Sequence, residues 1–429
     1  MREVRRRTIR AAAGGLALTA VAAAVPATAA IAGTNAAPAA KAAPAVKAAA
    51  SPKWQLFDVP VQGKVSLLSV AATGTDDAWA GGLLLNPQNP PHPPETPGLR
   101  RLAKDPSQGF RQLAKAASDE DDDNCTFAKG MFTSVMLHWD GHSWQQTPVP
   151  SSARINHLSA STPNDAWAST DCGMLHWDGR NWTAVPIAPV HAQQVGTEAI
   201  KAISPTEAWL TGSTYDNTTQ VTRAFVQRWD GRKWRDVPLP ALGDNFALDN
   251  MDARRPNDVW AAGTVDVDND VHPDPLLLLH WNGRTWKRFP APETGEWTKF
   301  LMSVRAVAKN NVWIAGWGKH APGIEEIRRP MLLHWNGHKW TSEKAPDERG
   351  ELYDVAVSRG QALAVGDTFS PSEPDYTMYA LRRTSSGWQH EPVPVEGEAD
   401  LWALAPIPGG GIWSVGTAGD YRPVIARRR

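Results

Sequence analysis

The sequence is poor in cysteine, with only 2 in 429 residues. A fold held together by many disulfides is therefore excluded, although one bridge can still form. The formal net charge at pH 7 is −1, so the chain lacks the basic surplus with which proteins bind nucleic acid. Beyond the N-terminal region, no apolar run reaches the roughly 20 residues that a membrane-spanning helix needs.

Sequence signatures of several catalytic classes are also absent. The chain contains no nucleophile elbow, no phosphate-binding P-loop and no His-Glu-x-x-His pair of metal ligands. Among 45 acidic residues, no single pair stands out as the acid and base of a glycoside hydrolase. The residue in excess is tryptophan, at 21 copies, which must either pack a repeated core or line binding surfaces.

Residues 1–29 have the three parts of a secretory signal peptide. Five arginines lie within residues 2–10, an apolar run covers residues 11–25, and residues 27–29 read Ala-Thr-Ala, a signal peptidase site. The Arg6-Arg7 pair resembles a twin-arginine signal but lacks the strongly apolar residues that usually follow, so both export routes stay open. Residues 30–52, mostly Ala and Pro, predict an extended linker. We expect a secreted protein folded over residues 53–429.

A short element recurs seven times in that folded part. Its first copy reads Asp-Ala-Trp-Ala-Gly, and the copies are centred on Trp79, Trp167, Trp209, Trp260, Trp313, Leu363 and Trp413. A second element, Leu-His-Trp-Asp-Gly-x-x-Trp, follows each of the first six copies. It ends at Trp144, Trp182, Trp234, Trp286 and Trp340, and a degenerate copy ends at Trp388. A repeat of about 40 to 55 residues indicates a propeller or a solenoid.

Each repeat fits four short strands, A to D. Strand A precedes the first element, strand B contains it, strand C is the Leu-His-Trp run, and strand D begins at the second Trp. The Asp-Gly or Asn-Gly between strands C and D predicts a two-residue hairpin turn. One such sheet cannot bury both faces alone, but radial stacking against its neighbours buries them. The pattern predicts an all-β fold, a seven-bladed β-propeller.

The two ends of the folded part complement each other. The last repeat stops after a strand C, whereas residues 54–60 have the Trp and Val-Pro form of a strand D. The N-terminal strand should therefore complete the last blade and leave no open sheet edge. The predicted blades are residues 61–150, 151–190, 191–242, 243–292, 293–346, 347–395, and 396–429 together with 53–60.

These motifs carry a resemblance to known propellers. The Asp-Gly-x-x-Trp hairpin resembles the Asp-box turns of sialidase-like propellers, although the leading Ser of that motif is missing. The Trp and Gly of strand B resemble kelch-type repeats. Over residues 53–429, the whole pattern resembles the exported Trp-repeat propellers of actinobacteria. The resemblance implies a fold and not a reaction.

We expect any ligand to bind on the face that carries the B–C loops and the D–A connectors. These vary in length and composition, whereas the A–B and C–D turns are uniform. Eighteen tryptophans and four recurrent histidines fall on repeat positions, which predicts packing roles for them; the histidines are His138, His176, His280 and His334. Trp297, Trp317 and Trp402 fall outside the repeat. They are candidate ligand-binding residues if exposed, and local packing beneath loops is the alternative.

The longest B–C loop, roughly residues 83–132, includes a Pro-rich stretch and an acidic run. Cys125 lies in this loop, and Cys172 lies in the corresponding loop of the next blade. In an exported protein we expect a disulfide between them, with two reduced thiols as the alternative.

Four aspartates between strands B and C of the fourth repeat resemble the start of a calcium-binding loop. They are Asp266, Asp268, Asp270 and Asp274. Val271 stands where such a loop needs Gly, and Leu277 stands where it needs a bidentate Glu. A looser Ca²⁺ site is one hypothesis, and a solvated acidic loop without a cofactor is the alternative.

The sequence favours a secreted, non-enzymatic binding propeller that recognises an extracellular polysaccharide or protein. The alternative is a secreted carbohydrate-active enzyme, a glycoside hydrolase or lyase, with its site at the channel mouth. Carboxylates clustered at that mouth would favour the enzyme, and an aromatic patch without titratable pairs would favour binding. We expect a monomer that binds no nucleic acid and inserts into no membrane.

Overall fold

The computed structural model divides the chain into two units, Met1–Ala48 and Ala49–Arg429. The structure describes residues 54–86, 132–151, 153–171, 173–192, 194–265, 276–296, 298–319, 327–346, 349–370 and 373–429. The predicted signal peptide and linker lie outside these ranges. Among the described residues, no helix is long and apolar enough to cross a membrane.

All regular secondary structure of the described residues is β-strand. In chain order the strands are β1 (Trp54–Phe57), β2 (Val65–Ala72), β3 (Ala78–Leu85), β4 (Phe132–Trp139), β5 (Trp144–Gln146), β6 (Ile155–Thr162), β7 (Asp165–Thr170), β8 (Gly173–Trp177), β9 (Trp182–Val185), β10 (Gln194–Ser204), β11 (Glu207–Asp216), β12 (Val221–Trp229), β13 (Trp234–Asp236), β14 (Phe246–Arg255), β15 (Asp258–Val265), β16 (Leu276–Trp281), β17 (Trp286–Phe289), β18 (Thr298–Ala308), β19 (Asn311–Lys319), β20 (Arg328–Trp335), β21 (Trp340–Glu343), β22 (Glu351–Ser358), β23 (Gln361–Ser370), β24 (Glu373–Thr384), β25 (Gly387–Glu391), β26 (Ala399–Pro406), β27 (Ile412–Ala418) and β28 (Arg422–Arg428).

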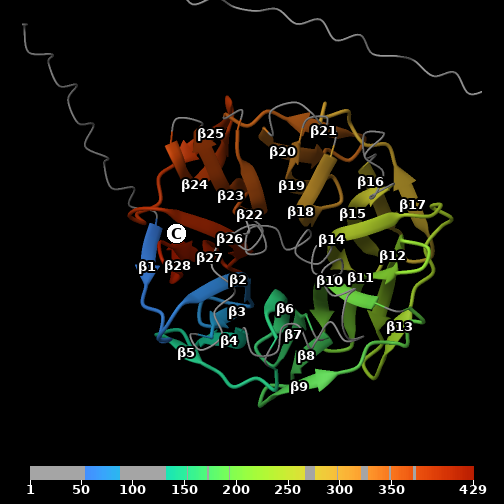
Figure 1. Ribbon diagram of the computed structural model, residues 1–429, viewed down its shortest axis with the longest axis horizontal. Coiled ribbons are helices and arrows are strands. Elements are labelled where there is room, and N and C mark those ends of the chain that lie inside the picture. The colour runs from blue at the N-terminus through green and yellow to red at the C-terminus, as the bar shows by residue number, and fades with distance from the viewer. Residues whose placement is uncertain are drawn as a thin grey trace, which may run out of the picture. The chain divides into compact units, whose positions relative to one another are not determined.

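Within the described residues these strands form five four-stranded sheets and one eight-stranded sheet. The larger sheet consists of β10–β13 and β14–β17, joined by a single parallel residue pair, Arg223 with Phe246. Divided at that pair, the sheets match the repeats in the sequence, and we number them blades 1 to 7 from β2 onward. Figure 1 shows the sheets arranged around a centre, with the first strand of each innermost. The unit is an all-β propeller, as predicted.

The ring closes through the N-terminal strand. β1 pairs antiparallel with β28, so the last sheet has the order β1-β28-β27-β26. The indole of Trp54 in β1 donates a hydrogen bond of 3.1 Å to Glu391 of blade 6. The predicted completion of the last blade by the first strand is confirmed.

The strand-B tryptophan of one blade packs against the strand-C and strand-D tryptophans of the next blade. The ring of Trp79 lies 4.9 Å from that of Trp177 and 5.1 Å from that of Trp182, measured between centroids. Equivalent triplets join blades 2 and 3, 3 and 4, 4 and 5, and 7 and 1. The rings meet edge-on or tilted, the arrangement that aromatic pairs prefer. The repeated tryptophans therefore form the core between blades.

The recurrent histidines hold these tryptophans in place. His138 stacks on Trp79 at 4.3 Å, and its Nε2 atom lies 2.7 Å from Asp77 Oδ1. Blades 2 and 4 repeat the arrangement, and in blade 5 Asn311 takes the place of the aspartate. The packing role predicted for these histidines is confirmed.

The two-residue hairpin predicted between strands C and D is wrong for blades 1 to 5. In blade 1, Trp139 pairs with Trp144, which leaves a four-residue loop. Asp140 Oδ1 accepts hydrogen bonds of 2.8 Å from the backbone N–H groups of His142 and Ser143. Within this loop only Gly141 has a positive φ, at 94°. The aspartate side chain closes a longer turn, so the Asp-Gly pair does not require the mirror-image hairpin.

Blades 6 and 7 replace the strand-C tryptophan by arginine, and the preceding blade supplies a glutamate. Arg383 donates two hydrogen bonds of 2.9 Å to Glu343, and Arg428 bonds through two guanidinium nitrogens to Glu391. In each case the strand-D tryptophan, Trp388 or Trp54, donates its indole N–H to the same glutamate. In the other blades, the third residue after the strand-D tryptophan is apolar or a threonine instead of glutamate. One example is Phe289, whose ring centroid lies 5.1 Å from that of Trp335.

The Arg428–Glu391 pair is nearly fully buried, with side-chain exposures of 9% and 5%. Glu391→Val should lower the free energy of unfolding by about 3–5 kcal/mol, because it leaves a buried arginine without its partner. Adding Arg428→Trp rebuilds the apolar interface of the other blades and should restore most of the loss. Urea denaturation of the wild type, both single variants and the double variant measures this coupling. A double variant no more stable than Glu391→Val would contradict the interpretation.

Candidate functional site

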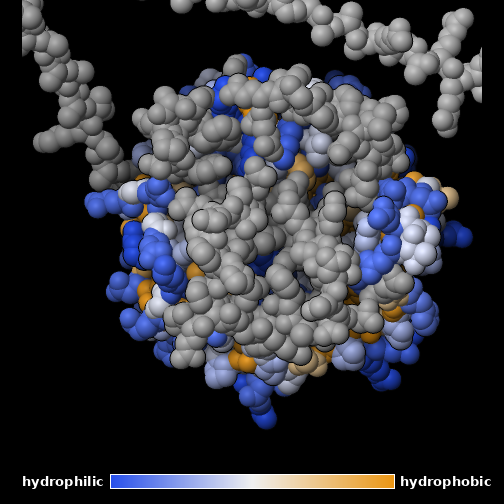
Figure 2. Space-filling model, in the orientation of Figure 1, coloured by the Kyte–Doolittle hydropathy of each residue, from blue (hydrophilic) through white to orange (hydrophobic). Residues whose placement is uncertain are grey.

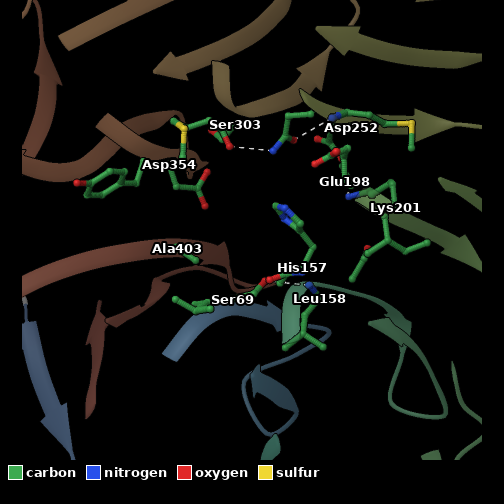
Figure 3. A pocket seen from close by; sticks show the side chains of 18 of the residues that line it. Ser69, His157, Leu158, Glu198, Lys201, Asp252, Ser303, Asp354 and Ala403 are labelled. Atoms are coloured by element: carbon green, nitrogen blue, oxygen red, sulfur yellow. Dashed lines mark hydrogen bonds and ion pairs between the residues drawn. The ribbon is translucent and has the colours of Figure 1, made fainter. Parts of the chain in front are cut away.

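A partly open cavity lies at the centre of the ring of innermost strands. It has a volume of about 120 Å³ and is lined by side chains from all seven innermost strands, β2, β6, β10, β14, β18, β22 and β26. Figure 3 shows these side chains converging from opposite sides of the channel. Since a cavity of about 150 Å³ holds one benzene molecule, this smaller cavity suits a small polar group.

Side chains in the channel join neighbouring blades. Ser69, Ser159 and Ser303 accept hydrogen bonds from backbone N–H groups of the next innermost strand, at 2.9, 2.9 and 3.1 Å. Asp252 and Asp354 accept equivalent bonds of 2.8 and 2.7 Å. Because each bond satisfies a buried backbone donor, these five residues are components of the ring closure.

Two ion pairs cross the same channel. Lys201 Nζ lies 2.8 Å from Asp252 Oδ1, and Arg305 Nη2 lies 2.8 Å from Asp354 Oδ2. Arg305 also donates to the carbonyl oxygens of Val355 and Leu404, at 3.0 and 2.8 Å. Although burial opposes its charge, the pKa of Arg305 is raised by the nearby Asp354 and Asp252 carboxylates. Arg305 therefore links three blades as a permanent cation.

His157 also lines the described part of the channel. Its imidazole takes no part in the hydrogen bonds and ion pairs between blades that are described above. Its half-buried ring projects into the cavity in Figure 3, between Asp354 on one side and Glu198 and Lys201 on the other. Burial, together with the positive charges of Arg305 and Arg154, lowers the pKa of His157 to about 4. The ring is therefore neutral at pH 7 and offers one donor and one acceptor to a channel ligand.

The channel geometry limits its chemistry. A general acid or base must change its protonation state, but doing so at Asp252 or Asp354 would weaken a bond between blades. Among the described residues, no group of three or more His, Cys, Asp or Glu side chains is arranged to hold a metal ion. The channel suits recognition of a small polar group better than acid–base turnover.

Two of the predicted ligand-binding tryptophans are buried. Trp317 is 1% exposed and stacks on Phe300 with 4.1 Å between ring centroids. Trp402 is 7% exposed and packs on Tyr353 at 4.5 Å. Their candidacy for ligand binding depended on exposure, and Phe300 and Tyr353 pack against them instead. Local packing, the alternative, describes them both, and a direct ligand contact by either stays a prediction.

Beside Trp402 lies a buried polar cluster that the sequence did not reveal. The Tyr353 hydroxyl lies 2.9 Å from Asp367 Oδ2 and 3.2 Å from Glu351 Oε2, and Arg328 pairs with Glu351. Burial and these carboxylates raise the pKa of Tyr353 well above its usual value. All four side chains are less than 12% exposed, which fits a structural role.

The remaining sequence predictions concern residues outside the described ranges. These are Trp297, the cysteines Cys125 and Cys172, and the four aspartates Asp266, Asp268, Asp270 and Asp274. The disulfide, the Ca²⁺ site and a ligand role for Trp297 stay predictions.

The channel residues do have a signal in the sequence, which the repeat pattern alone does not show. In blades 2, 4 and 5, polar residues occupy both the eighth and the tenth position before the strand-B tryptophan. His157 and Ser159 precede Trp167 in this way, and Ser303 and Arg305 precede Trp313. Blade 7, by contrast, has alanine at both positions. Polar residues recurring at one strand register identify the channel lining.

The described part of the surface lacks an extended apolar patch. In Figure 2 the atoms in view that are not grey are mainly hydrophilic, with small separate hydrophobic areas. Among the described residues, the large hydrophobic side chains that are exposed are Leu56 and Val307. Any binding surface on the described part therefore works mainly through polar groups.

Comparison with known proteins gives the fold. No family model and no curated protein matches the sequence. Similar solved structures include YCF48 bound to a D1 peptide, with 15% identity, a TM-score of 0.51 and coverage of 88% of this chain and 96% of the other. A catalytically inactive virginiamycin B lyase from Staphylococcus aureus with quinupristin has 11% identity, a TM-score of 0.54 and coverage of 88% and 99%. At these identities the likeness shows a β-propeller fold alone.

His157 should make stability depend on pH. Its folded pKa of about 4 lies below the unfolded value of about 6.5, so the unfolded chain binds more protons between them. The stabilisation is complete above pH 6.5 and is lost as the pH falls towards 4, by on the order of 3 kcal/mol. In urea denaturation at several pH values, His157→Gln should remove this part of the slope. The same change at exposed His338 is the control, and equal slopes for both variants would contradict the assignment.

Proposed function

We propose that this propeller is a secreted binding module that recognises an extracellular polysaccharide or protein with the face formed by its B–C loops and D–A connectors. The observation that carries the proposal is the contrast between the two sets of connections. In blades 1 to 5 the C–D turns are uniformly four residues long, as in residues 140–143 and 178–181. The B–C connections range from residues 171–172 in blade 2 to residues 86–131 in blade 1.

This contrast has a physical meaning for binding. Uniform turns are those that the packing of the ring constrains, and variable connections are free to acquire contacts with a ligand. We call the face that carries the B–C loops and the D–A connectors the variable face. The hydrogen bonds between innermost strands make the scaffold rigid, so residues on the variable face keep fixed relative positions. Such pre-organisation lowers the entropy cost of binding. The neutral His157 supplies one polar contact for a group that reaches the channel.

The partner classes of similar propellers are compatible with this role. YCF48 is seen with a D1 peptide, and virginiamycin B lyase with quinupristin. We infer a macromolecular or peptide-like ligand for this chain, and a signal-directed extracellular location from residues 1–29.

A lyase or hydrolase is the second candidate, favoured by one observation. A neutral imidazole, His157, and an amine, Lys201, line one cavity with several carboxylates. We rank it second because Asp252, Asp354 and Arg305 are engaged in bonds between blades.

The test is a binding screen of the full chain against cell-wall polysaccharides, glycan arrays and envelope proteins. Replacing residues 87–131 by a short Gly-Ser linker should weaken binding at least tenfold, because it removes the longest connection of the variable face. A change in the uniform turns, Arg180→Glu with His338→Glu, is the matched control and should leave binding unchanged. Loss of binding in the control alone would refute the assignment of the face. Release of unsaturated or reducing sugar ends would instead establish the enzyme.

A further inference from the structure

A second cavity lies between blades 5 and 6, on the side of the uniform turns. Its volume is about 820 Å³, within the range of about 300–1,000 Å³ that ligand pockets occupy. Its polar lining includes Asn311 and His334 from blade 5 and Gln361, Arg382 and Arg383 from blade 6. We call this cavity the blade 5–6 groove.

The groove exists because blade 6 departs from the repeat. Where a strand-C tryptophan would cover Trp313, the chain has Arg383, whose guanidinium carbon lies 5.4 Å from the Trp313 ring centroid. The C–D hairpin of blade 6 is also shorter than in the earlier repeats, since Thr384 pairs with Gly387 across two residues. A bulky side chain and a long turn are thus missing from one interface. Blade 7 makes the same replacement with Arg428, but there the arginine is buried.

The charge of the lining changes at the same place. In blades 1 to 4 the position two residues before the strand-B tryptophan is acidic, and its residues are Asp77, Asp165, Glu207 and Asp258. In blades 5 and 6 the corresponding residues are the amides Asn311 and Gln361. Among the described residues, the groove lining includes two arginines and no carboxylate. The substitutions therefore replace a carboxylate by an amide at this repeat position, and the amides line the groove together with the two arginines.

The two arginines are held in place but keep donors for a ligand. Arg383 uses Nε and Nη2 to bind Glu343, so Nη1 stays available. Arg382 pairs through Nε with Glu391 at 3.2 Å. The arginines are 42% and 30% exposed, while the glutamates are 17% and 5% exposed. A ligand in the groove would thus meet guanidinium donors, with the carboxylates behind them.

The geometry points to the blade 5–6 groove as a binding site for a short acidic saccharide whose sugar rings bear carboxylates. Guanidinium groups bind carboxylates through paired, charge-assisted hydrogen bonds. The amides of Asn310, Asn311 and Gln361 and the hydroxyls of Thr384 and Ser385 supply partners for sugar hydroxyls. The described lining lacks the exposed apolar anchor with which a peptide would be held, because Trp313 is buried. This site lies away from the variable face and does not rest on the function proposed above.

The test uses calorimetric titration of the full chain with trimers of galacturonate, glucuronate and mannuronate. Their methyl esters are the matched neutral probes. At least one acidic trimer should bind, and its ester should bind at least tenfold more weakly. Arg382→Gln and Arg383→Gln should each weaken binding at least tenfold. The pair Arg383→Trp with Glu343→Val restores the standard interface, so it should keep the thermal midpoint and abolish binding.

Two control variants show whether the saccharide binds in this groove or elsewhere on the propeller. Arg228→Gln changes the arginine at the same repeat position as Arg382 in blade 3, and it should leave the affinity unchanged. Replacing residues 87–131 by a short linker should also leave it unchanged, and a loss there would place the acidic saccharide on the variable face. The proposal is overturned if no acidic trimer binds or if the esters bind as tightly as the acids. It is also overturned if the double variant Arg383→Trp with Glu343→Val still binds, or if an oligoglutamate binds more tightly than every trimer.

Discussion

The packing of each strand-B tryptophan between two blades is the interaction on which the rest of this structure depends. A four-stranded sheet buries its faces only against neighbours, so the ring is stable only if each interface is filled. An indole buried between blades is worth about 3–5 kcal/mol, judged by the cost of truncating such residues to alanine. Several such triplets, with histidine–aspartate pairs behind them, explain why the chain carries tryptophan in such excess. The innermost hydrogen bonds add direction to this packing, because they link the first strands of blades 1 and 2, 2 and 3, 4 and 5, 5 and 6, and 6 and 7.

The two interfaces that lack the tryptophan triplet show how the constraint can be met by other means. An arginine of one blade and a glutamate of the preceding blade take the places of a tryptophan and an apolar residue, and the strand-D indole donates to the glutamate. A buried ion pair must recover the free energy of removing two charges from water, and it does so only with good geometry and further hydrogen bonds. Glu391 meets this requirement through Arg428, Arg382 and Trp54. The corresponding pair of Arg383 and Glu343 is more exposed to solvent, so the missing tryptophan leaves a groove between blades 5 and 6.

The sequence was sufficient for the architecture because the architecture is periodic. The repeat identified the strands, and the unmatched strand D at Trp54 identified the closure. Prediction failed where a contact depends on a side chain that the repeat pattern does not identify as a partner. The turn at Asp140 was misassigned because its side chain, rather than a mirror-image backbone, closes the loop. For Trp317 and Trp402 the sequence left ligand contact and local packing open, because a non-repeated tryptophan gives no indication of Phe300 or Tyr353 lying against it. The residues that line the channel could not be named from the repeat, because His157 and Arg305 become neighbours only when the ring closes.

The same closure argues for binding over catalysis on this scaffold. A catalytic carboxylate must be free to gain and lose a proton, and its surroundings must tolerate both states. Asp354 accepts backbone hydrogen bonds from Val355 and Leu404 and pairs with Arg305, so neutralising it would weaken contacts among three blades. Asp252 is held in the same way by Ala306 and Lys201. The channel charges that in another propeller could serve chemistry are here part of the framework. The positions that the ring leaves unconstrained are the variable connections and the interface between blades 5 and 6, where the arginine–glutamate pair stays partly exposed.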